Sequence, residues 1–428
     1  MRKNLKNVDI FQKIAYNNNR GDEKMLIKFN FKNFKSFKNE NCLDMEATSI
    51  KEHEYNVVNE GGVKYLKVAA IYGANASGKT NVLQAFNYMK GRILVSDDSM
   101  KISPIDNENL YSFMINDEPI ALEVELLAKN KKIYKYGFEV VKNKIVSEWL
   151  YLKKMTTYSV IFERENENVE LLKYKDKFNV DDNTLFLNVY TKLHSTDEDF
   201  SNVYAWFINA NYLDLGDPRF ENIINNRVFL KILSDKKYRS ELVRFIKTFD
   251  SGVEDIRTTP ETIEEVKSNN NTIKIELIHK TEQNEIKALP LELESNGTRK
   301  MFHLFDYLMD SLKFGLVLFI DELDAKLHPL LTRYIINLFH NSDTNIGNGQ
   351  LIYSTHDTVN LNKETFRRDE IWFAEKNLNG ISKIYSLSDY KIDNVKIRND
   401  ATYNKDYLTG KYGAIPVLEQ FDMDTNEG

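Results

Sequence analysis

Residues 73–80 read GANASGKT and match the pattern GxxxxGK[ST] of a phosphate-binding loop. The apolar run YLKVAAIY at 65–72 precedes this loop and predicts a buried strand. The stretch KTNVLQAFNYMKGRILVS, which begins at residue 79, has the apolar spacing of a helix. Glycine is scarce, at 17 of 428 residues, so a chance match is rare. The order of strand, glycine loop and helix predicts an α/β fold with a nucleotide site at the loop.

Each residue type in this loop has a chemical task. Gly73 and Gly78 let the backbone wrap closely around a phosphate, and the amides at the helix start point at the anion. Lys79 would place its charge on the β- and γ-phosphates of ATP, and Thr80 would offer a hydroxyl to Mg²⁺. The alternative is a plain glycine turn before a helix. The residues expected to bind the nucleotide are Gly73, Ala74, Asn75, Ala76, Ser77, Gly78, Lys79, Thr80 and Asn81.

Composition excludes several classes of protein. With 42% apolar and 29% charged residues, the chain is neither mainly disordered nor collagen-like. The net charge of −6 means that nucleic-acid binding would need a local basic patch. The single cysteine, Cys42, excludes a disulfide scaffold and a cysteine-based zinc site. The longest apolar run, 314–320, has the length of a strand, so we expect a cytoplasmic protein that does not enter a membrane.

A second buried strand ends in acids in the stretch FGLVLFIDELD, residues 314–324. Asp321 and Glu322 follow the apolar run directly, which is the Walker B pattern. Asp321 would hold Mg²⁺ directly or through water, and Glu322 would polarise the attacking water. An acidic pair at a strand end could instead cap a helix. The phosphate loop in the same chain favours the catalytic interpretation.

The stretch LDAKLHP at 323–329 follows at once. It resembles the D-loop of ABC-type ATPases, in the form DE-x-D-x-x-L-H-P of the SMC, RecF and OLD branch. The resemblance implies a nucleotide contact for Asp324. His356, at the end of the strand LIYSTH, has the position of the ABC switch histidine, whose role in the family is to sense the γ-phosphate. A capping or core histidine is the alternative for His356.

The stretch ESNGTR at 294–299 resembles the ABC signature of the same branch. In ABC enzymes this loop opens a helix and binds the γ-phosphate held by the opposite subunit. A hydroxyl, a glycine amide and a helix N-terminus make an anion site, although the same residues are also a routine turn. The signature residues with this expected role are Ser295, Asn296, Gly297 and Thr298.

The whole order of motifs resembles the bacterial ABC-type ATPases of the SMC/RecF/OLD branch that are called AAA-family proteins. Within them it resembles the abortive-infection group typified by the RloA/AbiL ATPase and the ATPase of the PARIS defence system. Three stretches are similar to that group: IYGANASGKTNVLQA, ESNGTRKMF and YLTGKYGAIPVL. No Q-loop glutamine can be placed in residues 120–150. The resemblance puts further nucleotide contacts near residues 33–36, where a plain amphipathic strand is the alternative.

The resemblance implies an α/β fold: a P-loop ABC-ATPase head with a mixed sheet flanked by helices, an antiparallel β subdomain and a helical insertion. We expect a polar extension at 1–24, with Met25 as an alternative start. The first lobe of the head is expected at 25–155, a mainly helical insertion at 156–264, and the second lobe with the tail at 265–428.

The resemblance also implies a mechanism and partners. Two heads would sandwich two ATP molecules with Mg²⁺ as a homodimer, or in a higher oligomer, and hydrolysis would reopen it. The family is thought to sense a phage-derived trigger and to control a separately encoded effector, often a TOPRIM-like nuclease. No acid cluster of an attached TOPRIM domain follows Tyr412. The sequence therefore predicts an ATPase that needs a separate effector.

Two other functions compete with this hypothesis. A RecF-like DNA-repair or recombination ATPase would clamp DNA, and the stretch 231–247 could supply a basic strip, although a solvated helix face explains the same residues. A transporter ATPase is disfavoured by the large insertion, the missing Q-loop and the lack of a membrane segment. Stimulation of ATP hydrolysis by DNA would distinguish the repair ATPase, and membrane association would distinguish the transporter.

Overall fold

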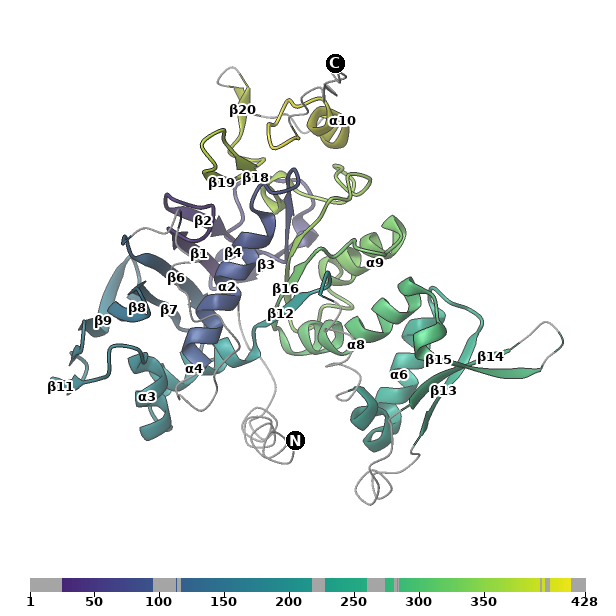
Figure 1. Cartoon of the computed structure of the whole chain (residues 1–428), viewed down its shortest axis with the longest axis horizontal. Helices are drawn as coiled ribbons and strands as arrows, with labels where there is room; N and C mark the ends of the chain where they lie inside the picture. The colour runs from purple at the N-terminus through teal and green to yellow at the C-terminus, as the bar shows by residue number, and fades with distance from the viewer. Residues whose placement is uncertain are drawn as a thin grey trace, which may run out of the picture.

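The structure is a computed structural model that describes residues 25–94, 113, 117–217, 228–259, 274–280, 283, 285–392, 395–396 and 401–416. The polar extension predicted for residues 1–24 lies outside the described residues. Figure 1 shows helix α2 between an antiparallel sheet on one side and the central sheet with α8 and α9 on the other. No helix in the described part of the chain is both long and apolar enough to cross a membrane.

The central sheet has six strands in the order β12-β16-β17-β5-β18-β19. They are β5 (Val68–Tyr72), β12 (Asn211–Asp214), β16 (Val317–Asp321), β17 (Gln350–Ser354), β18 (Ile371–Lys376) and β19 (Ser382–Ser386). The first five pair in parallel, and β19 is antiparallel to β18. Every residue of β5, β16 and β17 is buried, which is why these strands read as continuous apolar runs. Parallel pairing puts the carboxyl ends of β5, β12, β16 and β17 at one edge of the sheet.

Helices cover both faces of the central sheet. They are α2 (Lys79–Leu94), α8 (Asn296–Phe314) and α9 (Pro329–His340). Because side chains alternate along a strand, β5 contributes to two cores. Ala69 and Ile71 pack in the core that contains α2, whereas Ala70 and Tyr72 pack in the core that contains α8 and α9. The strand that leads into the phosphate loop is therefore fixed from both sides.

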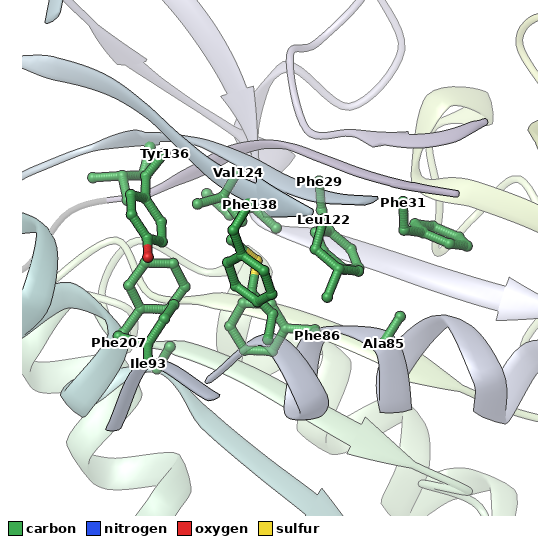
Figure 2. Close-up of a cluster of buried hydrophobic side chains, with 14 of the residues drawn as sticks. Phe29, Phe31, Ala85, Phe86, Ile93, Leu122, Val124, Tyr136, Phe138 and Phe207 are labelled. Carbon is green, nitrogen blue, oxygen red and sulfur yellow. The ribbon is translucent and has the colours of Figure 1, made fainter. Parts of the chain in front are cut away.

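An eight-stranded antiparallel sheet covers the outer side of α2 in the order β11-β10-β9-β8-β7-β6-β1-β2. Its strands are β1 (Leu26–Lys32), β2 (Asn41–Asp44), β6 (Ile120–Leu127), β7 (Ile133–Val141), β8 (Lys144–Lys154), β9 (Thr157–Glu165), β10 (Asn168–Leu171) and β11 (Asp176–Asn179). Figure 2 shows Phe86 of α2 among Phe29, Leu122 and Phe138 of this sheet. The ring of Phe86 also stacks on Phe319 of β16, with centroids 3.9 Å apart. Helix α2 thus joins the two sheets through one apolar core.

A smaller α/β unit precedes the signature. Helix α6 packs on β13 and α8, and β13, β14 and β15 form a three-stranded antiparallel sheet. The elements are α6 (Lys236–Lys247), β13 (Val253–Thr259), β14 (Lys274–Lys280) and β15 (Ile286–Pro290). The remaining elements are η1 (Glu54–Asn56), β3 (Val57–Glu60), β4 (Val63–Leu66), α3 (Phe186–Leu193), α4 (Glu198–Asn209), η3 (Leu291–Leu293), η4 (Arg368–Glu370), β20 (Lys391–Ile392), β21 (Val395–Lys396) and α10 (Tyr403–Leu408).

The predicted α/β head, with a mixed sheet, flanking helices and an antiparallel β subdomain, is confirmed. The apolar spacing of the stretch FSNVYAWFINANYL at 200–213 predicts one helix, and this prediction is wrong at its end. Residues 211–213 belong to strand β12, because α4 stops at Asn209 and the chain then pairs with β16. The region 156–264, predicted to be mainly helical, contains α3, α4 and α6 but also β9 to β13. The β8–β9 hairpin crosses the predicted boundary at residue 155, so the antiparallel sheet extends into this region.

Candidate functional site

The phosphate loop connects the end of β5 to the start of α2 in a tightly packed turn. At Gly73 an added Cβ would lie 2.4 Å from the carbonyl oxygen of Ala374 in β18. Gly78 has φ +112°, and a Cβ there would lie 3.1 Å from the ring of Phe37. A side chain at either position would force neighbouring residues to move, namely Ala374 beside Gly73 and Phe37 beside Gly78. Both glycines of the pattern are therefore explained by the packing of the loop.

The loop residues Ser77 and Lys79 present polar groups in a buried setting. The ammonium of Lys79, which is 6% exposed, donates hydrogen bonds to the carbonyl oxygens of Gly73 at 2.8 Å and Ala74 at 2.9 Å. Burial lowers the pKa of Lys79 to about 8, although the carboxylates across the site oppose this shift. The hydroxyl of Ser77 is buried and has no hydrogen-bond partner among the residues that the structure describes. A buried cation and an unpartnered hydroxyl in a glycine-lined loop fit a phosphate.

Asp321 and Thr80 meet at the carboxyl edge of the central sheet. The Thr80 hydroxyl donates to Asp321 Oδ1 at 3.3 Å, and the Ser354 hydroxyl at the end of β17 donates to the same oxygen. Burial raises the pKa of Asp321, and the carboxylates of Asp214 and Glu322 raise it further. A hydroxyl beside a buried carboxylate is the oxygen donor set that suits Mg²⁺. The two residues predicted to hold the metal ion therefore lie together and fit it.

Glu322 begins the turn after β16 with φ +53°. Its backbone N–H donates to the Ser354 hydroxyl at 2.8 Å, so Ser354 connects Asp321 and Glu322. This turn directs the half-buried Glu322 carboxylate toward the loop that follows β12. A Cβ added to Gly216 would lie 3.1 Å from Glu322 Oε2. The carboxylate predicted to be the general base is thus held at the same sheet edge as Thr80 and Asp321.

Asp214 is a site residue that the sequence analysis missed. It ends β12, pairs in register with Asp321 on the neighbouring strand, and raises the pKa of Asp321. Residues 200–213 looked like one continuous helix, which hid the strand end. The sequence signal for this strand end is Asp214 itself, a polar residue directly after the short run NYL, together with the turn at Gly216.

Asp324 and His356 connect the D-loop to the end of β17. The backbone N–H of His356 donates to both carboxylate oxygens of Asp324, at 3.3 and 3.2 Å. Burial and the charge of Lys79 lower the pKa of His356, which favours the neutral imidazole. His328, which follows in the same run, accepts a hydrogen bond from Leu330 N–H and caps α9. Asp324 and His356 therefore lie near the phosphate loop, while His328 is structural.

The signature residues lie apart from this group. The Ser295 hydroxyl caps α8 by accepting from Thr298 N–H at 3.1 Å, and the Thr298 hydroxyl donates to Asp250 at 3.1 Å. Ser295 and Asn296 are exposed. Lys300, one turn along α8, donates to the Ala325 carbonyl in the D-loop. No hydrogen bond among the described residues joins residues 295–298 to the phosphate loop, so the signature is connected to the D-loop but not to the loop in its own chain.

The segment near residues 33–36 lies against the start of α2. The Asn81 amide donates to Ser36 Oγ at 2.8 Å, and the Ser382 hydroxyl contacts the same oxygen at 2.8 Å. Lys35 bonds Gln84 of α2, and burial lowers the pKa of Lys35. The alternation of apolar and polar residues in LIKFNFKNFKSF at 26–37 predicts one continuous strand. Strand β1 instead ends at Lys32, and residues 33–36 form a turn. The turn buttresses the phosphate loop through Asn81.

Half of the six cations in the basic stretch 231–247 pair with acidic neighbours. These pairs join Lys231 with Asp306, Arg239 with Asp255 and Lys247 with Glu254. Pairing of this kind is typical of a solvated helix face. The other three cations are Lys236, Lys237 and Arg244, so a basic strip for a DNA backbone stays a prediction.

Comparisons with known proteins are consistent with this site. Residues 68–362, more than half of the chain, match the family model described as "AAA domain, putative AbiEii toxin, Type IV TA system". No curated protein matches the chain significantly.

Three solved structures are similar to this chain at low sequence identity and with TM-scores below 0.5. An SmcHead bound to the C-winged helix domain of ScpA has a TM-score of 0.48 at 14% identity, covering 84% of this chain and 97% of that one. The SMC head domain from Thermotoga maritima has a TM-score of 0.40 at 15% identity, with 86% and 99% covered. The recombination mediator RecF, in a structure named RecF-ATPrS, has a TM-score of 0.39 at 14% identity, with 85% and 99% covered.

Proposed function

The chain belongs to the AAA domain family described as a putative AbiEii toxin of a type IV toxin–antitoxin system, and from this premise we propose that it is an ATP-binding and ATP-hydrolysing switch. The observation that carries the proposal is the meeting of two motifs at one sheet edge. Thr80 of the phosphate loop bonds Asp321 of the Walker B strand across 241 residues of sequence. Sequence patterns alone do not require this contact, whereas a nucleotide site does.

The chain's own groups have distinct tasks in hydrolysis. The loop amides and Lys79 bind the phosphates, and Thr80 with Asp321 would hold Mg²⁺, which neutralises charge on the β- and γ-oxygens when bound. Glu322 accepts a proton from water as the water oxygen bonds to the γ-phosphorus and the bond to ADP breaks. His356, whose lowered pKa favours the neutral imidazole, offers a ring N–H to the γ-phosphate.

A second copy of the chain completes the site in this proposal. The signature residues 295–298 lie at the start of α8, where a hydroxyl and helix amides make an anion site, and two of them, Ser295 and Asn296, are exposed while Thr298 is buried. Their bonds reach Asp250 and not the phosphate loop of the same chain. Two heads that face each other would place each loop against the partner's signature. ATP would close this homodimer, and hydrolysis would open it.

The switch serves anti-phage defence by abortive infection in this proposal. The toxin–antitoxin wording of the family description supports a role in which the host cell is harmed under control. The ATPase would respond to a phage-derived trigger and release or license a separately encoded effector, a TOPRIM-like nuclease. A cytoplasmic location follows from that role.

Plating efficiency of a phage panel tests the defence role. Cells that carry the gene with its native flanking DNA should be protected, and cells that carry a Lys79→Ala copy should not. Equal plating on both strains for every phage would contradict the proposal. Survival after DNA damage and stimulation of ATP hydrolysis by DNA would then test a RecF-like repair role.

A further inference from the structure

The carboxy-terminal tail, residues 403–416, packs against the side of the central sheet next to the phosphate loop. Tyr407 of α10 stacks on Phe373 of β18, with centroids 5.3 Å apart and planes at 21°. Tyr412 is fully buried, and Ala414 is 3% exposed. The tail is therefore part of the packed core and not a loose end.

One hydrogen bond connects this tail directly to the phosphate loop. The backbone N–H of Ala74 donates to the carbonyl oxygen of Ala414 at 2.8 Å. The Tyr407 hydroxyl donates to the same oxygen at 3.1 Å. The tail thus uses an amide of the loop itself, more than 300 residues away in sequence.

The position of this carbonyl is fixed by several independent contacts. Ala414 N–H donates to Glu375 Oε1 at 3.3 Å, and the Tyr385 hydroxyl donates to the Tyr412 carbonyl at 2.6 Å. Gly413 has φ +68°, and a Cβ there would lie 2.6 Å from Glu375 Oε1. A Cβ at Gly413 would add the strain of a positive φ and push the Glu375 carboxylate away from Ala414 N–H, so glycine favours the present placement of the Ala414 carbonyl.

The peptide unit that the tail contacts also holds the lysine of the loop. The N–H of Ala74 and the carbonyl of Gly73 belong to one planar trans peptide, so they point in opposite directions. The N–H is bound by Ala414, and the carbonyl accepts from Lys79 at 2.8 Å. Rotation of this peptide would break both bonds together. The tail therefore sets the orientation of a group that positions Lys79.

We propose that the tail is a positioning element of the nucleotide site, which orients the Gly73–Ala74 peptide and through it Lys79. The inference rests on the proposed function, in which the loop binds ATP. It has a reciprocal consequence, because binding of nucleotide and docking of the tail share one coupling free energy. Nucleotide should stabilise the docked tail as much as the docked tail strengthens nucleotide binding.

The test compares Gly413→Ala with Gly61→Ala in the full chain. Both glycines have similar positive φ, at +68° and +61°, but a Cβ at Gly61 meets no atom within 4 Å. The control thus repeats the backbone strain without displacing the tail. Two quantities are measured: the affinity for a fluorescent ATP analogue, and hydrogen exchange of peptides covering residues 68–80.

We expect Gly413→Ala to weaken nucleotide binding by about fivefold to tenfold, the effect of losing one or two hydrogen bonds. The turnover rate at saturating ATP should stay near that of the parent, because Asp321 and Glu322 are untouched. Hydrogen exchange of the peptides that cover residues 68–80 should rise in Gly413→Ala but not in Gly61→Ala. Tyr407→Phe keeps the ring and removes one hydrogen bond to Ala414, so its loss of nucleotide affinity should be smaller. This variant replaces Gly413→Ala in the test if Gly413→Ala does not fold.

The outcomes separate this inference from the proposed function. If the parent binds nucleotide, and Gly413→Ala and Tyr407→Phe match Gly61→Ala in affinity and exchange, the tail inference is overturned while the ATPase proposal stands. If the parent binds no nucleotide, the ATPase proposal fails. Hydrogen exchange then decides alone whether the tail holds the loop.

Discussion

The phosphate-loop region and the signature region differ in how their side chains are paired. Around the loop, Thr80, Asp321 and Ser354 bond one another, and elements from across the chain meet at one sheet edge. At the signature, the described contacts of the Ser295 side chain stay within its own helix turn, Thr298 bonds Asp250, and Asn296 is exposed. Under the proposed function, this difference is the one expected of a composite site. The missing half would come from a second copy.

Removal of the loop lysine should have the largest effect. Lys79→Ala deletes the cation that faces the phosphates, so nucleotide affinity should fall by at least about a hundredfold, the magnitude of a lost charge-assisted contact. Titration with a fluorescent ATP analogue measures the change. Lys64→Ala, at an exposed lysine paired with Glu54, is the matched control and should bind like the parent. Unchanged affinity in Lys79→Ala would remove the phosphate-loop assignment.

Glu322→Gln should separate binding from hydrolysis. The amide cannot accept the proton of water, so turnover should fall by roughly a hundredfold to ten-thousandfold while ATP still binds. Closed dimers should accumulate, which size-exclusion chromatography with ATP detects. Glu364→Gln, at an exposed glutamate, should behave like the parent. Wild-type turnover in Glu322→Gln would show that another group is the base.

The pH dependence of binding should reveal the buried setting of Lys79. Burial lowers its pKa to about 8 in the free protein, and bound phosphate favours the charged form. Above pH 8 the free lysine loses its proton, so binding must take a proton up. Nucleotide affinity should therefore fall by up to about tenfold per pH unit above pH 8 and stay level just below it. In Lys79→Arg the guanidinium stays charged, so this slope should vanish; a flat profile in the parent would contradict the lowered pKa.

The sequence predicted the local chemistry and the meeting of Thr80 with Asp321 that the two motifs imply, but it did not predict long-range contacts that belong to no motif. Gly73, Gly78 and Lys79 follow from one eight-residue pattern, because their roles depend on a single turn. Asp214 was missed because its role depends on strand pairing with β16, which the helical spacing before it obscured.

The stretch KDYLTGKYGAIPVLEQF at 405–421 predicts a short ordered tail. The bond between the Ala414 carbonyl and Ala74 N–H depends instead on packing against β18 and β19. A pattern of residues near one another in sequence does not encode that contact. The segment 26–37 shows the same limit, since its alternation predicts a strand but packing against α2 makes its second half a turn.

ATP hydrolysis by mixed variants tests most directly whether a second copy completes the site. Lys79→Ala and Ser295→Arg are each expected to be inactive alone. A mixed dimer would have one site built from the intact loop of one chain and the intact signature of the other. A random equal mixture should then recover about a quarter of the parent activity, since half of the dimers are mixed and each has one intact site.

Mixing Lys79→Ala with Glu322→Gln is the matched control, because both residues act in the same head and no intact site can form. We predict that ATP hydrolysis recovers when Lys79→Ala is mixed with Ser295→Arg and does not recover when Lys79→Ala is mixed with Glu322→Gln. No recovery in either mixture, with both variants folded and able to dimerise, would contradict a site shared between two copies of the chain.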